Sequence, residues 1–163
     1  MNREVMFLDI AETIAKQSHC VRIQVGAVLV KDTRIISTGY NGTPSSFINC
    51  ADYFKDSSFY KDSEAGRIPN ATPSSEDREA HHKWSTKFEV HAEMNALLYA
   101  ARVGISTSGC TMYVTHQPCH QCLKNMIAAD IYAVVYRHPY DRSDWDVNTE
   151  SLIYATNFRV RRI

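Results

Sequence analysis

The chain has 163 residues, a formal net charge of +0, and apolar and charged fractions of 44% and 22%, which predict one globular domain over residues 1–163. The balanced charge argues against a polynucleotide partner, which a basic face would normally meet, but it allows a mononucleotide. No apolar run reaches the length of a membrane span, and the five cysteines suit a reducing compartment, so we expect a cytoplasmic protein without membrane contact.

The first part of the chain predicts a helix followed by a β-hairpin. Residues 2–18 repeat apolar side chains at helical spacing, which predicts an amphipathic helix packed on the core. A short apolar run at 25–30 predicts a buried strand, and after a polar turn residues 35–40 predict a second strand, so the pair forms a hairpin. Gly39 and Gly42 close this stretch, which indicates either a backbone passing close to another segment or a plain turn.

Residues 43–88 are the least regular part of the sequence. They carry clusters of serine, proline and aspartate that favour turns. We therefore expect an irregular insertion within the domain at about 43–88, not a second domain. Beyond it the apolar pattern predicts helices at 89–103, 119–129 and 144–155 and strands at 111–115, 131–136 and 158–160. Alternating strands and helices indicate an α/β layered domain with a largely parallel half.

Two short motifs lie where two of the predicted helices begin. They are His91-Ala92-Glu93 and Pro118-Cys119-His120-Gln121-Cys122. One imidazole and two thiols are zinc ligands, and three protein ligands leave a fourth tetrahedral position for water, as in a catalytic site. Residues two apart in a helix interior do not meet, so His91 and Glu93 serve one site only from the first turn. Helix N-termini also favour thiolates and a developing oxyanion.

The combination of the two motifs is more specific than either alone. A Cys-x-x-Cys pair by itself is commonly a structural zinc knuckle or a redox pair, whereas H-x-E followed by P-C-x-x-C is typical of zinc-dependent base deaminases. The chain resembles the cytidine/deoxycytidylate deaminase superfamily, and most closely its deoxycytidylate branch. The stretches that carry the resemblance are Val25-Gly26-Ala27-Val28, Gly39-Tyr40-Asn41-Gly42-Thr43-Pro44, His91-Ala92-Glu93-Met94-Asn95-Ala96, Tyr113-Val114-Thr115 and the Pro-Cys motif.

The resemblance implies a fold, a reaction and a catalytic centre. The fold is a three-layer α/β/α cytidine deaminase-like domain with a five-stranded mixed sheet. The reaction is zinc-dependent hydrolysis of dCMP to dUMP and ammonia, which supplies dUMP for thymidylate synthesis. His91, Cys119 and Cys122 are then the ligands of a catalytic Zn²⁺. Glu93 is then the catalytic residue that takes a proton from water, protonates N3 of the ring and delivers a proton to the departing ammonia.

The resemblance also implies substrate contacts and regulation. Asn41 is similar to the family's ligand for the sugar hydroxyl, and four residues match groups that hold the 5′-phosphate: Arg22, Ser46, Tyr136 and Arg137. Arginine and tyrosine suit phosphate oxygens, although a surface ion pair and a strand-end tyrosine are the structural alternatives. The family is commonly hexameric, activated by dCTP with Mg²⁺ and inhibited by dTTP, so we expect a homo-hexamer with these allosteric ligands.

Four residues outside the two motifs match a second, structural zinc that some viral relatives carry. They are Cys20, Cys50, His81 and Glu89, with His82 as the alternative to His81. Two thiolates, an imidazole and a carboxylate would form a closed site, and it would pin the insertion to the end of the first helix. The alternative is that the two cysteines are ordinary small buried residues.

Other hypotheses remain from the sequence alone. Within the superfamily they are deaminases of free cytidine or deoxycytidine, of adenosine in transfer RNA, and of riboflavin precursors. The transfer-RNA hypothesis predicts a basic face, which the balanced charge does not supply, and a free-nucleoside enzyme needs no phosphate pocket. The hypothesis from a different class is a non-catalytic, zinc-stabilised nucleotide-binding module. Such modules often lose the glutamate, which is present here as Glu93.

Overall fold

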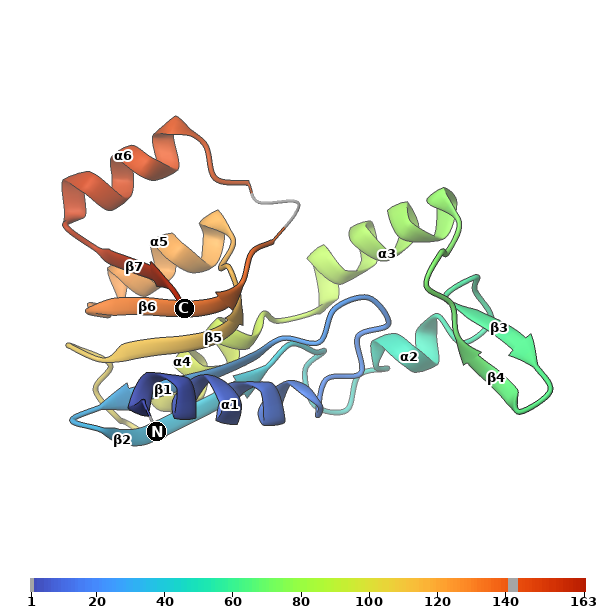
Figure 1. Ribbon diagram of the computed structural model, residues 1–163, viewed down its shortest axis with the longest axis horizontal. Coiled ribbons are helices and arrows are strands. Elements are labelled where there is room, and N and C mark those ends of the chain that lie inside the picture. The colour runs from blue at the N-terminus through green and yellow to red at the C-terminus, as the bar shows by residue number, and fades with distance from the viewer. Residues whose placement is uncertain (1, 141–143) are drawn as a thin grey trace.

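A five-stranded sheet forms the centre of the computed structural model, which describes residues 2–140 and 144–163 (Figure 1). The strand order is β2-β1-β5-β6-β7. The strands are β1 Gly26–Lys31, β2 Arg34–Tyr40, β5 Thr111–His116, β6 Ala133–His138 and β7 Arg159–Arg162. β1 is antiparallel to β2 and β5, whereas β5, β6 and β7 are parallel. The mixed five-stranded sheet and the N-terminal hairpin are therefore confirmed.

Helices cover both faces of the sheet and complete three layers (Figure 1). They are α1 Arg3–Ala15 on one face, and α4 Ala92–Arg102, α5 His120–Ala128 and α6 Val147–Thr156 on the other. The layers follow from the alternation of side chains along a strand: Val28 packs in the cluster of α1, whereas Ala27 and Leu29 pack in the cluster of α4. Among the described residues, none of the helices has the length and apolar character needed to cross a bilayer.

Two glycines let the hairpin pass directly against helix backbone. A Cβ on Gly26 would lie 2.1 Å from the Ala11 carbonyl oxygen, and a Cβ on Gly39 would lie 2.2 Å from the Ala92 carbonyl oxygen. Neither separation is compatible with a side chain. β1 therefore approaches α1, and β2 approaches the first turn of α4, only because these residues are glycines. The close approach considered for Gly39 is confirmed.

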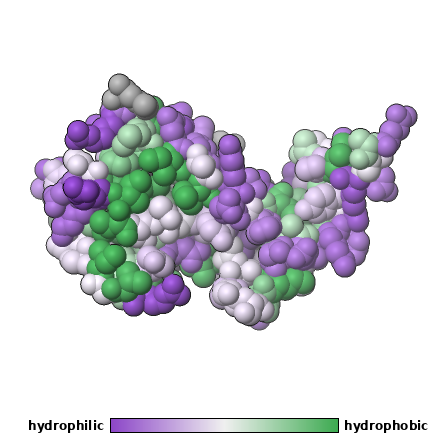
Figure 2. Space-filling view, turned by 90° about the horizontal axis from the view of Figure 1, so that it is seen from below, coloured by the Kyte–Doolittle hydropathy of each residue, from purple (hydrophilic) through white to green (hydrophobic). Residues whose placement is uncertain are grey.

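Residues 43–88 form a smaller lobe that projects from the main body (Figures 1 and 2). The expectation of irregular structure was wrong for much of it. It contains α2 Cys50–Tyr53, a hairpin of β3 Tyr60–Ser63 and β4 Gly66–Pro69, and α3 Ser75–Phe88, a helix of 14 residues. Only His81 and Trp84 of α3 are buried, so apolar periodicity gave no signal. The lobe has a small core of its own, formed by Cys50, Phe54, Phe59 and Trp84.

Strand boundaries near the C-terminus differ from the predicted ones by one or two residues. β6 starts at Ala133 because Ile131 still belongs to the turn after α5, where its N–H donates to the Met126 carbonyl at 3.0 Å. β7 extends over Arg161 and Arg162, whose backbones pair with β6 although their side chains are exposed. Polar strand ends of this kind escape a search for apolar runs.

Candidate active site

The chain before α4 is tied to the end of β2. Gly42 and Val90 exchange both backbone hydrogen bonds, with N···O distances of 3.1 and 2.8 Å, and the Asn95 side chain donates to the Tyr40 carbonyl at 2.7 Å. His91 is extended as the N-cap of α4 and makes no side-chain capping bond to that helix. Its ring is thereby presented to a second helix.

The second helix, α5, opens with the Pro-Cys motif. Pro118 is fully buried, and Cys119 is the extended N-cap whose sulfur accepts from the Cys122 N–H at 3.4 Å. The Nδ1 atom of His91 lies 3.5 Å from Cys119 Sγ and 3.4 Å from Cys122 Sγ. The N-termini of α4 and α5 therefore meet, and their partial positive charges favour anionic ligands there.

The three side chains fit a zinc ion. Their donor atoms lie within 4.8 Å of one another. Tetrahedral zinc with bonds of about 2.3 Å to sulfur and 2.0 Å to nitrogen would separate sulfur from nitrogen by roughly 3.5 Å, which matches the two distances from His91. Two thiolates and an imidazole also suit zinc chemically. Since tetrahedral zinc takes four ligands, this set leaves one position for water.

The close contacts and burial of these groups shift their pKa values. The hydrogen bond with Cys122, and then that with His91, lower the pKa of Cys119 to about 4 against the effect of burial. The same thiol contact and burial raise the pKa of Cys122, and Cys119 raises the pKa of His91 to about 9. Glu93 is only 4% exposed, and burial raises the pKa of its carboxyl. A carboxyl with a raised pKa is suited to accept and return a proton near neutral pH.

A second cluster lies between the end of α1 and the lobe. Cys20 Sγ is 3.5 Å from Nε2 of the buried His81, and the Val21 N–H donates to Cys50 Sγ at 3.5 Å. The donor atoms of Cys20, Cys50 and His81 lie within 4.8 Å of one another. The contact with Cys50 lowers the pKa of Cys20 to about 4 and raises that of Cys50. The cluster therefore joins Cys20, which precedes β1, to Cys50 and His81 of the lobe.

Glu89, the C-cap of α3, lies beside this second cluster. Its Oε1 atom is buried without a hydrogen-bond partner among residues 2–140 and 144–163. Burial and the charge of Cys20 raise the pKa of this carboxyl to about 7. Buried polar atoms are normally satisfied, so an orphaned carboxylate oxygen near two thiols fits a closed zinc site. The alternative ligand His82 is exposed and lies beside Arg78 on the outer side of α3.

Two of the predicted substrate residues belong to the loops beside β2. Asn41 is 7% exposed, and its side chain accepts from the Val25 N–H at 2.8 Å and donates to the Ile23 carbonyl at 3.0 Å. It therefore fastens the segment before β1 to the end of β2. Ser46 is exposed with a positive φ of 72° and lines a cavity of about 170 Å³ that also contacts Glu89.

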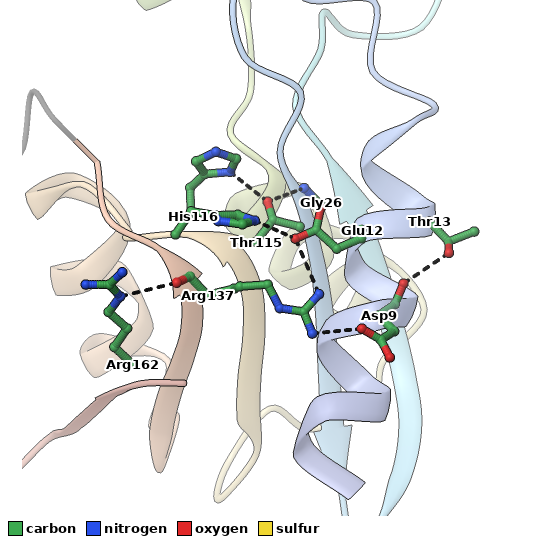
Figure 3. A network of polar contacts seen from close by, with 9 residues as sticks. Asp9, Glu12, Thr13, Gly26, Thr115, His116, Arg137 and Arg162 are labelled. Carbon is green, nitrogen blue, oxygen red and sulfur yellow. Dashed lines mark hydrogen bonds and ion pairs between the residues drawn. The ribbon is translucent and has the colours of Figure 1, made fainter. Parts of the chain in front are cut away.

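The other predicted substrate residues lie elsewhere. Arg137 is held by α1, with Nη2 2.7 Å from Asp9 and Nη1 3.6 Å from Glu12 (Figure 3). Tyr136, its neighbour in β6, packs against the core beneath α4 and α5. Arg22 is partly buried and forms no salt bridge within the described part of the chain. No polar contact between described residues joins Arg137 to Ser46 or Arg22.

Two histidines at the ends of parallel strands were not predicted as site residues. His116 and His138 are register partners with ring centroids 5.1 Å apart. His138 Nε2 is 2.9 Å from Glu12, and His116 Nδ1 is 3.0 Å from the Thr115 hydroxyl, which accepts from the Gly26 N–H (Figure 3). Burial, and then His138, lower the pKa of His116. The available signal was a histidine within two residues after each of the strands predicted at 111–115 and 131–136, because ligands bind outside the carboxyl ends of parallel strands.

Comparisons with known proteins agree with this geometry. Residues 1–138 match the family "Cytidine and deoxycytidylate deaminase zinc-binding region". The deoxycytidylate deaminase of Enterobacteria phage T4 is 41% identical over 155 residues, which cover 85% of this chain and 80% of that protein. The deoxycytidylate deaminase of Mycobacterium phage D29 is 39% identical over 131 residues, which cover 80% and 90%. The crystal structure of dCMP deaminase from the cyanophage S-TIM5 in complex with dCMP and dUMP superposes with a TM-score of 0.69 at 29% identity, covering 100% of this chain and 99% of that one.

Proposed function

The chain belongs to the cytidine and deoxycytidylate deaminase family, and on that premise we propose that it hydrolyses dCMP to dUMP and ammonia. The similarity to phage deoxycytidylate deaminases over most of both chains supports this substrate. So does the likeness to a structure with dCMP and dUMP bound. The dUMP formed in this way serves thymidylate synthesis.

One observation carries the proposal: a zinc-type donor set and a buried carboxyl meet where two helices begin. His91, Cys119 and Cys122 supply the donors, and Glu93 lies two residues after His91 in the first turn of α4. A structural zinc site needs no such carboxyl, whereas hydrolysis of an amidine needs a group that moves protons. The Glu93 position therefore favours an enzyme over a binding module.

The mechanism assigns Glu93 two proton transfers. A bound Zn²⁺ lowers the pKa of a water molecule and so supplies a nucleophile at neutral pH. The Glu93 carboxylate accepts a proton as the water oxygen bonds to C4 of the cytosine ring, and it passes this proton to N3. Glu93 then moves the remaining hydroxyl proton to the amino nitrogen, the C4–N bond breaks, and ammonia leaves as the C4 carbonyl forms. Burial keeps bulk water from competing for these protons.

Five residues are proposed to hold the rest of the nucleotide. Asn41 binds the sugar hydroxyl through the lone pair and the N–H that its backbone contacts leave unused. Arg22, Tyr136, Arg137 and Ser46 are proposed for the 5′-phosphate. Because Arg137 already pairs with two carboxylates of α1, the phosphate has to share or displace that pairing. A charge-assisted, bidentate contact from a guanidinium to phosphate is strong enough for this.

A second, structural zinc is proposed at Cys20, Cys50, His81 and Glu89. The orphaned Glu89 oxygen and the converging donors support it. Such an ion would fasten the lobe to the end of α1, where the lobe's own apolar core is small. We accordingly propose one deaminase domain over residues 1–163, with residues 43–88 as an insertion.

Assembly and regulation are carried over from the family as proposals. We propose a homo-hexamer, activation by dCTP with Mg²⁺, and inhibition by dTTP. Exposed apolar side chains on α4 and at its C-cap, namely Leu98, Tyr99 and Val103, support contact with another subunit. The cavity bordered by Ser46 and Glu89 supports a ligand near the second zinc. The cysteines are unpaired, which suits a reducing cytoplasm.

The experiment that tests the substrate compares turnover of dCMP, deoxycytidine and cytosine by the loss of ultraviolet absorbance. Two charge-assisted contacts to the phosphate, each worth about 1.5 kcal/mol or more, predict at least a ~100-fold preference for dCMP in kcat/KM. Equal or better turnover of deoxycytidine would reject the assignment in favour of a nucleoside deaminase. Turnover of none of the three, with zinc bound, would favour the binding module.

A further inference from the structure

The end of the chain holds the turn that carries Cys119. The family match stops at residue 138, yet three side chains from residues 144–149 contact the turn at residues 118–120. Trp145 Nε1 donates to the Pro118 carbonyl at 2.8 Å. The His120 N–H donates to the Asp144 carboxylate at 2.8 Å. These two bonds engage the residues immediately before and after Cys119.

The two bonds fix both peptide planes that flank Cys119. The Pro118 carbonyl belongs to the peptide unit that precedes Cys119, and the His120 N–H belongs to the one that follows it. Since each peptide unit is rigid and planar, holding both planes fixes φ and ψ of Cys119 and hence the direction of its Cα–Cβ bond. Cys119 is the extended N-cap of α5, which holds it through the bond from the Leu123 N–H to the Cys119 carbonyl at 2.9 Å, and the bonds to Asp144 and Trp145 add to that support.

A third contact fixes the side chain of His120, the residue after Cys119. The Thr149 hydroxyl is fully buried, lies 2.8 Å from His120 Nδ1, and donates to Asp146 at 3.0 Å. A hydroxyl has one proton to give, so the Nδ1 atom of His120 is the donor to Thr149. Asp146 also caps α6 by accepting from the Thr149 N–H at 2.9 Å. The start of α6 is therefore built around the residue that follows Cys119.

We propose that Asp144, Trp145 and Thr149 are positioning residues that hold the Cys119 sulfur in place for the metal. The inference rests on the proposed zinc site, and it extends that site beyond the residues matched by the family. Groups that orient metal ligands commonly change metal affinity by about 10-fold to 100-fold when they are removed. The structural alternative is that these contacts only attach α6 to α5.

The test measures the rate at which zinc leaves the protein to a coloured chelator. Zinc release from this site is identified as the kinetic phase that the wild-type protein shows and Cys119→Ser lacks. Two combined substitutions remove the donors: Thr149→Val removes a hydroxyl at nearly constant side-chain volume, and Trp145→Phe removes an N–H while keeping a smaller aromatic ring. Their matched control is Thr107→Val, which removes a hydroxyl bonded to the Ala129 carbonyl at 2.8 Å at the opposite end of α5.

The proposal predicts that zinc leaves this site about 10-fold faster in the combined variant and at the wild-type rate in Thr107→Val. Restoring the hydroxyl as Thr149→Ser in the Trp145→Phe background recovers part of the loss. Asp144→Ala gives an independent arm, because it removes the acceptor of the His120 N–H, and Asp144→Asn, which keeps an acceptor oxygen, loses less. Melting temperatures of all variants, measured on zinc-loaded protein, separate this effect from a general loss of stability.

Unchanged zinc release in both the combined variant and Asp144→Ala would overturn the proposal, as would equally fast release from Thr107→Val. The measurement uses no nucleotide. A chain that released zinc as predicted but did not deaminate dCMP would therefore uphold this inference and reject the proposed function. A chain that deaminated dCMP and released zinc at one rate in every variant would do the reverse.

Discussion

Replacement of Glu93 by glutamine should remove proton transfer while leaving zinc binding and dCMP binding in place. The substitution keeps the volume of a side chain that is only 4% exposed and removes its ability to accept a proton. One general acid–base group contributes about 10²-fold to 10⁴-fold to rate. In the proposed mechanism Glu93 acts both on the attacking water and on the leaving nitrogen, so we expect kcat to fall by about 10⁴-fold or more. At about 1.36 kcal/mol per factor of ten, this is roughly 5.4 kcal/mol of transition-state stabilisation.

The assay compares three quantities in wild-type and Glu93→Gln protein: kcat for dCMP, zinc per chain, and dCMP affinity by calorimetry. We expect zinc content to stay unchanged and affinity to change by only a few-fold, because Glu93 is not proposed as a metal ligand. Glu76→Gln, in the exposed first turn of α3, is the control and should match wild type. A kcat within about tenfold of wild type in Glu93→Gln would refute the assigned role. Loss of zinc along with activity would instead make Glu93 a part of the metal site.

Three further predictions concern the metals and the fold. Cys20→Ser combined with Cys50→Ser should lower zinc from about two ions per chain to about one by elemental analysis; a wild-type content of one would remove the second site. In that variant, zinc binding at the His91 site should release about two protons at pH 7, since its imidazole and one of its two thiols hold protons there. Affinity should therefore rise with pH between about 4 and 9, and calorimetry in buffers of different ionisation enthalpy that showed no proton release would contradict this. Gly39→Ala should lower the free energy of unfolding in urea by about 2 kcal/mol or more, because the new methyl group meets backbone at 2.2 Å. Gly42→Ala, whose methyl group meets nothing nearer than 3.8 Å, should cost much less. Equal effects would show that the chain relaxes around both.

The candidate catalytic cluster was accessible from sequence because its residues fall in two short motifs. Each motif stands at the start of a helix, so local spacing alone places His91 beside Glu93 and Cys119 beside Cys122. Only the pairing of the two motifs needed the family resemblance. Much of the sheet was predictable for a similar reason, since β1, β5 and β6 are centred on short apolar runs.

The features that could not be predicted from the sequence depend on contacts between distant segments. α3 was missed because it buries only two side chains, so no apolar period marks it. The pairing of Arg137 with α1 joins residues 128 positions apart in the chain, and no local pattern reports it. The contacts of Asp144 and Trp145 run from side chains to backbone. Because these contacts bind backbone atoms, they require no particular side chains in the turn at residues 118–120.

The central claim is that one zinc ion sits between the starts of α4 and α5 with a position left for the reacting water. Anomalous diffraction at the zinc edge, from a crystal soaked with a non-reactive dCMP analogue, tests this directly. We expect a peak bonded to His91, Cys119 and Cys122, with the pyrimidine ring and the Glu93 carboxylate on its open side. A peak with four protein ligands, or no zinc between these three residues, would contradict it.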